Sequence, residues 1–112
     1  MNINTAYFIG IGGAGMSALA RYYKHIGFEV KGYDRTATPL TDALISEGIE
    51  INFDDDIDSI PSSIAEAEKL LLVITPAIPD SNHQLQELIK KGHVPRKRAE
   101  ILGVIISGGN SI

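Results

Sequence analysis

Short continuous apolar runs alternate along the chain with segments of helical periodicity, and this unit repeats about four times. Such alternation is typical of buried parallel strands joined by crossover helices. The pattern predicts strands at residues 6–11, 29–33, 50–53 and 69–75 and a clipped fifth strand at Val94-Pro95. We therefore expect an α/β fold: a three-layer, Rossmann-like domain with an open, mainly parallel sheet of about five strands and helices on both faces.

Helical segments separate these strands, and each has an apolar face that we expect against the sheet. The inward positions are Met16, Leu19, Ala20, Tyr23 and Ile26 in the first helix, Leu40, Ala43 and Leu44 in the second, Leu85, Leu88 and Ile89 in the third, and Ala99, Ile101, Leu102 and Ile105 in the last. Thr38 followed by Pro39 predicts the start of the second helix, and Ser81 or Asn82 that of the third. A brief helical turn is expected near residues 61–63.

Length and composition narrow the class of protein. The 112 residues suffice for one domain, which we place at residues 1–112, and 44% hydrophobic residues are ordinary for a globular protein. The longest aliphatic run, residues 70–74, is far too short to cross a bilayer, no secretory signal is visible, and cysteine is absent. We therefore expect a cytoplasmic protein with no membrane partner. The net charge of −4 also argues against a nucleic-acid partner.

A glycine-rich turn joins the first predicted strand to the first predicted helix. Gly10, Gly12 and Gly15 fit the GxGxxG spacing, which lets backbone approach a pyrophosphate at a helix N-terminus. Asp34 follows the second strand, nineteen positions after Gly15, where dinucleotide-binding units carry an acid for a ribose hydroxyl. Arg35 beside it would instead suit a 2′-phosphate. NAD and a UDP-sugar both present a pyrophosphate flanked by ribose, so the loop alone leaves both open.

Three predicted loops should meet at one end of the sheet. They are the glycine loop, the Asp34-Arg35 pair, and residues 75–78, where Pro76 and Pro79 predict a stiff turn after the strongest strand. Because open α/β sheets bind ligands outside the carboxyl ends of their strands, we expect one ligand among these loops.

Other polar clusters carry weaker predictions. Arg96-Lys97-Arg98, expected in the first turn of the last helix, is a candidate phosphate contact, with Arg98 favoured. The acidic run at residues 54–58 lacks the glycine and glutamate of a calcium loop, and the three histidines share no ligand spacing, so we expect no metal site. With no triphosphate-binding loop, nucleophile elbow or paired carboxylates, this domain alone should bind without catalysing.

The glycine loop also belongs to a longer signature, which reads Phe8-Ile9-Gly10-Ile11-Gly12-Gly13-Ala14-Gly15-Met16-Ser17 and continues as Ala18-Leu19-Ala20. Further motifs follow in order: Gly32-Tyr33-Asp34, Gly48-Ile49, Val73-Ile74-Thr75-Pro76-Ala77-Ile78, Asn82, Val94-Pro95 and Arg98-Ala99-Glu100-Ile101-Leu102. Together they resemble the amino-terminal domain of the Mur ligases of peptidoglycan synthesis, in particular those that join L-alanine to UDP-N-acetylmuramate. The resemblance covers nearly the whole chain, with departures at Tyr33, Asn52-Phe53 and Thr75-Pro76.

The resemblance implies a set of residues that bind the UDP moiety. Backbone groups would hold the pyrophosphate, and Asp34 would meet the uridine. The implied set is Gly12, Gly13, Ala14, Gly15, Met16, Asp34, Arg35, Asn52, Thr75, Ala77, Ile78 and Arg98.

The resemblance further implies a three-domain enzyme of which this chain is the N-terminal fragment. This domain would bind UDP-N-acetylmuramate and no cofactor, while ATP, Mg²⁺ and L-alanine would bind to domains outside it. ATP would phosphorylate the muramyl carboxylate, and the amine of L-alanine would attack the acyl phosphate to form an amide. The fragment alone would be inactive.

Three alternatives stay open at this point. The first is the related Mur ligase that recycles a preformed tripeptide, which the intact Gly-Gly-Ala-Gly-Met signature disfavours. The second is a nicotinamide-binding module of a dehydrogenase or a redox-sensing regulator, which the position of Asp34 supports. The third is an interaction domain with a vestigial loop.

Overall fold

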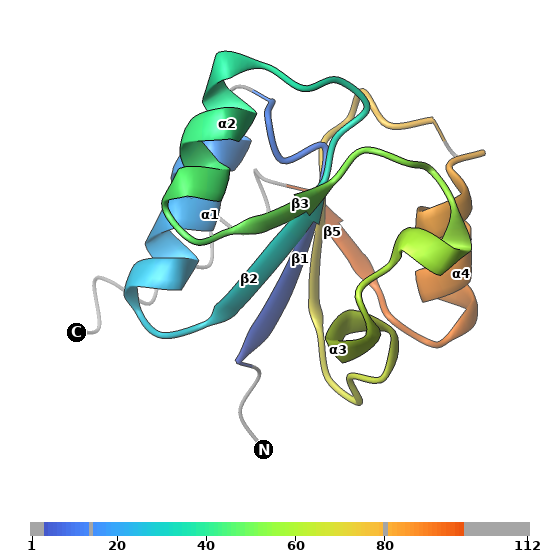
Figure 1. Ribbon diagram of the computed structural model, residues 1–112. Coiled ribbons are helices and arrows are strands. Elements are labelled where there is room, and N and C mark those ends of the chain that lie inside the picture. Colours follow the sequence, from blue (N-terminus) through green and yellow to red (C-terminus); the bar gives the residue numbers. More distant parts are fainter. Residues whose placement is uncertain (1–3, 14, 80, 98–112) are drawn as a thin grey trace.

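The computed structural model describes residues 4–13, 15–79 and 81–97, which form one parallel sheet between two layers of helices (Figure 1). The elements in chain order are β1 (Thr5–Ile9), α1 (Met16–His25), β2 (Glu29–Tyr33), α2 (Pro39–Ser46), β3 (Glu50–Asn52), the 3₁₀ turn η1 (Ile57–Ser59), α3 (Ser62–Ala65), β4 (Leu71–Ile74), α4 (His83–Lys90) and β5 (Pro95–Lys97). The strand order is β3-β2-β1-β4-β5, and every pair is parallel. The predicted α/β fold is confirmed.

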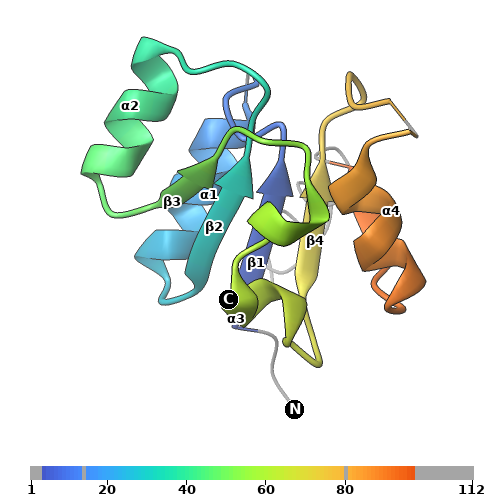
Figure 2. The same cartoon turned by 45° about the vertical axis from the view of Figure 1, so that its right-hand side comes forward.

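The central strand β1 separates two hydrophobic cores. Its successive side chains point to opposite faces of the sheet, as strand geometry requires. Ala6 and Phe8 pack with α1 and α2, whereas Tyr7 and Ile9 pack with α3 and α4, and all four are fully buried. Figures 1 and 2 show these helix pairs on opposite sides of the sheet.

The predicted helix starts agree with the structure. Thr38 accepts a hydrogen bond from the N–H of Thr41 and donates its own N–H to the Thr41 hydroxyl, which makes a reciprocal cap before Pro39. Asn82 caps α4 by accepting from the N–H of Leu85. Each cap satisfies backbone donors that the first helical turn leaves without an intrahelical partner.

Two predicted inward positions are wrong. Ile26 and Ile89 are 49% and 47% exposed. Ile26 lies just past the last residue of α1, so the helical period no longer directs it to the sheet. In α4 the inward face instead contains Gln84, with Leu85 and Leu88, which turns Ile89 toward solvent.

The basic cluster also lies differently from the prediction. Arg96 and Lys97 belong to strand β5 and pair with Val73 and Ile74 of β4, so they are not in the first turn of a helix. Because these residues pair with β4, their backbone is extended and not helical. The remainder of the predicted last helix, residues 98–105, lies outside the described residues.

Candidate functional site

A cavity of about 660 Å³ opens at the carboxyl ends of the strands, where the loops after β1, β2, β3 and β4 leave the same end of the sheet (Figure 1). Its lining residues are Gly10, Gly12, Gly13, Tyr33, Asp34, Arg35, Thr36, Phe53, Asp54, Asp55, Thr75, Ala77, Ile78, Pro79 and Asn82. The three loops that the sequence predicted to meet therefore do so. A fourth segment, residues 53–55 after β3, completes the wall.

The glycine loop requires glycine for space as well as for conformation. Gly10 has a φ of 90°, and a Cβ there would collide with the side chain of Thr75. A Cβ on Gly12 would lie 2.8 Å from a carboxylate oxygen of Asp34. The loop thus packs directly against the segments that follow β2 and β4, and any larger residue would separate these walls of the cavity.

Several loop amides form hydrogen bonds within the protein. The N–H of Gly12 donates to Asp34 Oδ2 at 2.8 Å, and the N–H of Gly13 donates to the carbonyl of Gly10 at 3.0 Å. The N–H of Met16 donates to the carbonyl of Gly13 at 3.0 Å. A pyrophosphate would therefore interact with the dipole of α1 and with backbone N–H groups of its first turn. Otherwise it would have to displace one of these internal hydrogen bonds.

Asp34 links the first two loops. Its Oδ2 accepts from Gly12 and its Oδ1 accepts from the N–H of Thr36 at 3.1 Å, while its own N–H donates to the carbonyl of Asn52 at 3.1 Å. A carboxylate offers about four lone-pair positions, so these two side-chain bonds leave capacity for ribose hydroxyls. Arg35 beside it lines the same cavity and is exposed.

The loop after β4 forms the opposite wall. The N–H of Thr75 donates to the carbonyl of Ile9 at 3.2 Å and so extends the pairing of β1 with β4. The chain then turns, because the N–H of Ile78 donates to the carbonyl of Thr75 at 3.1 Å. Thr75, Ala77 and Ile78 all line the cavity, at the positions where a ligand was expected.

Three described residues of the predicted set, Gly15, Met16 and Asn52, are not among those that line the cavity. Asn52 does not line the cavity: its side-chain amide donates to the Tyr7 hydroxyl at 2.7 Å and to the Gly32 carbonyl at 3.2 Å. Met16 is buried, with 1% of its surface exposed. Ala14 and Arg98 lie outside the described residues.

Sequence reasoning missed the wall formed by residues 53–55 and the buried Gln84. The position of Phe53, Asp54 and Asp55 just beyond a strand's carboxyl end could have indicated them. Nothing in the sequence marks Gln84, because a glutamine in an amphipathic helix is ordinarily placed on the polar face.

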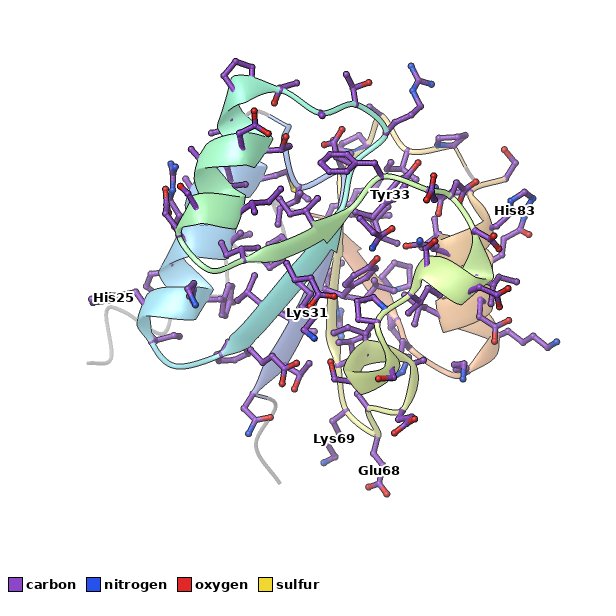
Figure 3. All side chains as sticks on the ribbon, in the orientation of Figure 1. His25, Lys31, Tyr33, Glu68, Lys69 and His83 are labelled. Atoms are coloured by element: carbon purple, nitrogen blue, oxygen red, sulfur yellow. The ribbon has the colours of Figure 1, made fainter. Side chains whose placement is uncertain are left out.

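Two tyrosines near the cavity keep their protons. Burial raises the pKa of the Tyr7 phenol well above its ordinary range. Burial also raises the pKa of Tyr33, and the nearby carboxylates of Asp55 and Asp34 add to the rise. Figure 3 labels Tyr33 at this end of the sheet and His83 at the start of α4. Both phenols therefore stay neutral near neutral pH, and that of Tyr7 donates a hydrogen bond to Gln84.

The described residues contain neither a candidate metal cluster nor a helix that could span a membrane. No cluster of three or more histidines and carboxylates among them could hold a metal ion. Within the same residues, the helices are too short to cross a bilayer.

Comparison with known proteins decides the family. The family model described as "Mur ligase family, catalytic domain" matches residues 5–109. The chain belongs to the Mur ligase family. The resemblance predicted from the sequence is thus confirmed, and the nicotinamide-binding and interaction-domain alternatives have no support from these comparisons.

Several relatives by sequence share one name. The chain is 50% identical over 108 residues to a UDP-N-acetylmuramate–L-alanine ligase of Flavobacterium johnsoniae, a match that covers 94% of this chain and 24% of the relative. The structure of a Mur ligase, UDP-N-acetylmuramate-alanine ligase MurC from Thermotoga maritima, superposes with a TM-score of 0.81 at 26% identity and covers 92% of this chain and 23% of that protein.

A second Mur ligase structure is also similar. The UDP-N-acetylmuramate:L-alanyl-gamma-D-glutamyl-meso-diaminopimelate ligase of Neisseria meningitides gives a TM-score of 0.69 at 25% identity, covering 87% of this chain and 29% of that one. The chain therefore spans about a quarter of the length of the Mur ligases it matches.

Proposed function

We propose that this chain forms the UDP-N-acetylmuramate-binding part of an ATP-dependent ligase that joins L-alanine to that sugar nucleotide. One observation carries the proposal: a single cavity joins the glycine loop before the N-terminus of α1 to the carboxylate of Asp34. A helix N-terminus favours an anion and a carboxylate favours hydroxyl donors, so the pair suits a pyrophosphate beside a ribose.

The remaining parts of the reaction belong to other segments in this proposal. The described residues hold no candidate metal cluster, and the 112-residue sequence has no GxxxxGK[ST] loop, so this chain does not fit ATP with Mg²⁺. We assign ATP, Mg²⁺ and L-alanine to the part of the protein that corresponds to the other three quarters of its relatives. A cytoplasmic location is part of the same proposal.

The proposed ligand contacts divide along the cavity. Gly12, Gly13 and Gly15 would face the pyrophosphate, together with Ala14 and Met16 of the same loop. Asp34 and Arg35 would meet the ribose side. The wall with Thr75, Ala77 and Ile78 would enclose the base. Asn52, which does not line the cavity, would act through its hydrogen bond with Gln84. Arg98 lies outside the described residues and stays a proposed contact.

A substitution in the glycine loop tests this assignment. Gly15→Val should abolish saturable binding of UDP-N-acetylmuramate, because a branched side chain at the start of α1 blocks the approach of the phosphates. Amide shifts of residues 12–16, followed by NMR during the titration, give the measurement.

Gly27→Val is the matched control. Gly27 also has a positive φ, 103° against 79° at Gly15, and a Cβ there meets nothing within 4 Å. It therefore reproduces the backbone strain at the opposite end of α1. Equal loss of binding in both variants, or unchanged binding in Gly15→Val, would remove the assignment.

A further inference from the structure

Gln84, in the first turn of α4, is fully buried and lies at the centre of a hydrogen-bonded network. Its Oε1 accepts from the Tyr7 hydroxyl at 2.6 Å. Its Nε2 donates to Asn52 Oδ1 at 2.9 Å and to the main-chain carbonyls of Asp54 at 2.8 Å and Asp56 at 3.1 Å. One side chain thus joins β1, β3 and the loop after β3.

The main-chain carbonyls fix the orientation of every group in this network. Carbonyls only accept hydrogen bonds, so the amide nitrogen of Gln84 must face Asp54 and Asp56. Its oxygen then faces Tyr7, whose single proton must be donated there. Asn52 must in turn present its nitrogen to the Tyr7 hydroxyl, which leaves its oxygen for Gln84. No other arrangement satisfies all members, and a buried polar group left without a partner destabilises the fold.

A side chain of the loop after β3 also binds the backbone of α4. Oδ1 of Asp55 accepts from the N–H of His83 at 2.8 Å and from the N–H of Gln84 at 3.2 Å. The segment between β3 and α3 therefore lies against the N-terminal end of α4, as Figure 2 shows. A side chain of each element holds the main chain of the other.

This segment is a wall of the nucleotide cavity. Phe53, Asp54 and Asp55 line the cavity, whereas Gln84 and Tyr7 do not. Residues 54–56 belong to no strand or helix, so no ladder of backbone hydrogen bonds holds them. Gln84 binds the carbonyls of Asp54 and Asp56 without itself lining the cavity.

We propose that Gln84 is a positioning residue for the nucleoside half of the ligand, acting through the wall of residues 53–55. The inference rests on the proposed function. It predicts that loss of the Gln84 amide weakens nucleoside recognition while the pyrophosphate end, built on the glycine loop and α1, is unaffected.

The test compares two ligands, UDP and inorganic pyrophosphate, by NMR titration of the 112-residue chain. Gln84→Met keeps the length of the side chain but loses every hydrogen bond of the amide. We expect its affinity for UDP to fall about tenfold, which corresponds to the net value of one to two hydrogen bonds. Its affinity for pyrophosphate should stay within about twofold of that of the unaltered chain, because the hydrogen bonds that the substitution removes do not involve the glycine loop.

Gln86→Met is the matched control, because it makes the same change on the exposed face of the same helix. Tyr7→Phe provides a second variant that keeps the ring and removes the hydroxyl that orients Gln84. It should weaken UDP binding selectively, and the double variant should be no weaker than Gln84→Met alone. If Gln84→Met does not fold, Tyr7→Phe decides the outcome.

The outcomes are distinct. Selective loss of UDP binding supports the inference. Unchanged UDP binding, or equal loss of UDP and pyrophosphate binding, overturns it and leaves the proposed function standing. Absence of UDP binding by the unaltered chain overturns the proposed function, and the inference with it.

Discussion

At the scale of single residues, Asp34 has one role in the structure and a second in the proposed complex. Its carboxylate holds the Gly12 and Thr36 amides in place, and in the proposed complex it also accepts from the ribose. The sequence spacing predicted the second role, whereas the first is visible only in the structure. A carboxylate that already orders the loop is preorganised for its ligand, which reduces the entropy lost on binding.

Asp34→Asn tests both roles together. An amide nitrogen would face one of the two backbone N–H donors, so we expect unfolding free energy to fall by about 1–2 kcal/mol and affinity for UDP-N-acetylmuramate to fall about tenfold. Urea unfolding and calorimetric titration measure the two effects. Asp58→Asn, in an exposed position outside the cavity, should change neither. Undiminished affinity in Asp34→Asn would contradict the ribose assignment.

At the scale of elements, α2 shows how local sequence determines a helix boundary. Thr38 and Thr41 exchange hydrogen bonds across the first turn, and Pro39 occupies a position where its missing N–H is not needed. The cap stabilises the helix that packs against β3 and α1, and Thr38 does not line the cavity.

Thr38→Ala should lower the free energy of unfolding by about 1 kcal/mol, the usual loss for an N-cap threonine. Ligand affinity should not change, because Thr38 is not among the cavity residues. Urea unfolding gives the measurement, with Ser46→Ala at the other end of α2 as its control. A stability equal to that of the unaltered chain would show that the cap contributes nothing here.

Strands and helices were predictable to the extent that local patterns determine them. Both ends of β2 were predicted correctly, whereas β1 and β4 are shorter than the apolar runs that predicted them. The run at residues 6–11 includes Ile11, which is fully buried although it lies in the turn after β1. Burial without strand pairing looks the same in sequence as a strand, so hydrophobicity alone overestimated the length.

At the scale of the whole molecule, topology places the site. A parallel sheet of order β3-β2-β1-β4-β5 brings four strand-to-helix loops to one end, and three of them were predicted from sequence. The wall at Phe53 and the network around Gln84 were not predicted. They depend on contacts between residues 28 to 77 positions apart, which no local pattern encodes.

The family and the cavity together lead to one central claim, that this chain binds a UDP-sugar. The fold superposes on the Mur ligase of Thermotoga maritima with a TM-score of 0.81. The cavity itself would accommodate any pyrophosphate flanked by ribose, including a nicotinamide dinucleotide. The identity of the nucleotide therefore needs a direct measurement.

That measurement is a calorimetric titration of the chain with UDP-N-acetylmuramate and, in parallel, with NADH. We predict saturable binding of the UDP-sugar, competition by UDP, and no heat of binding from NADH. Binding of NADH alone would contradict the account and show that the cavity serves a redox cofactor.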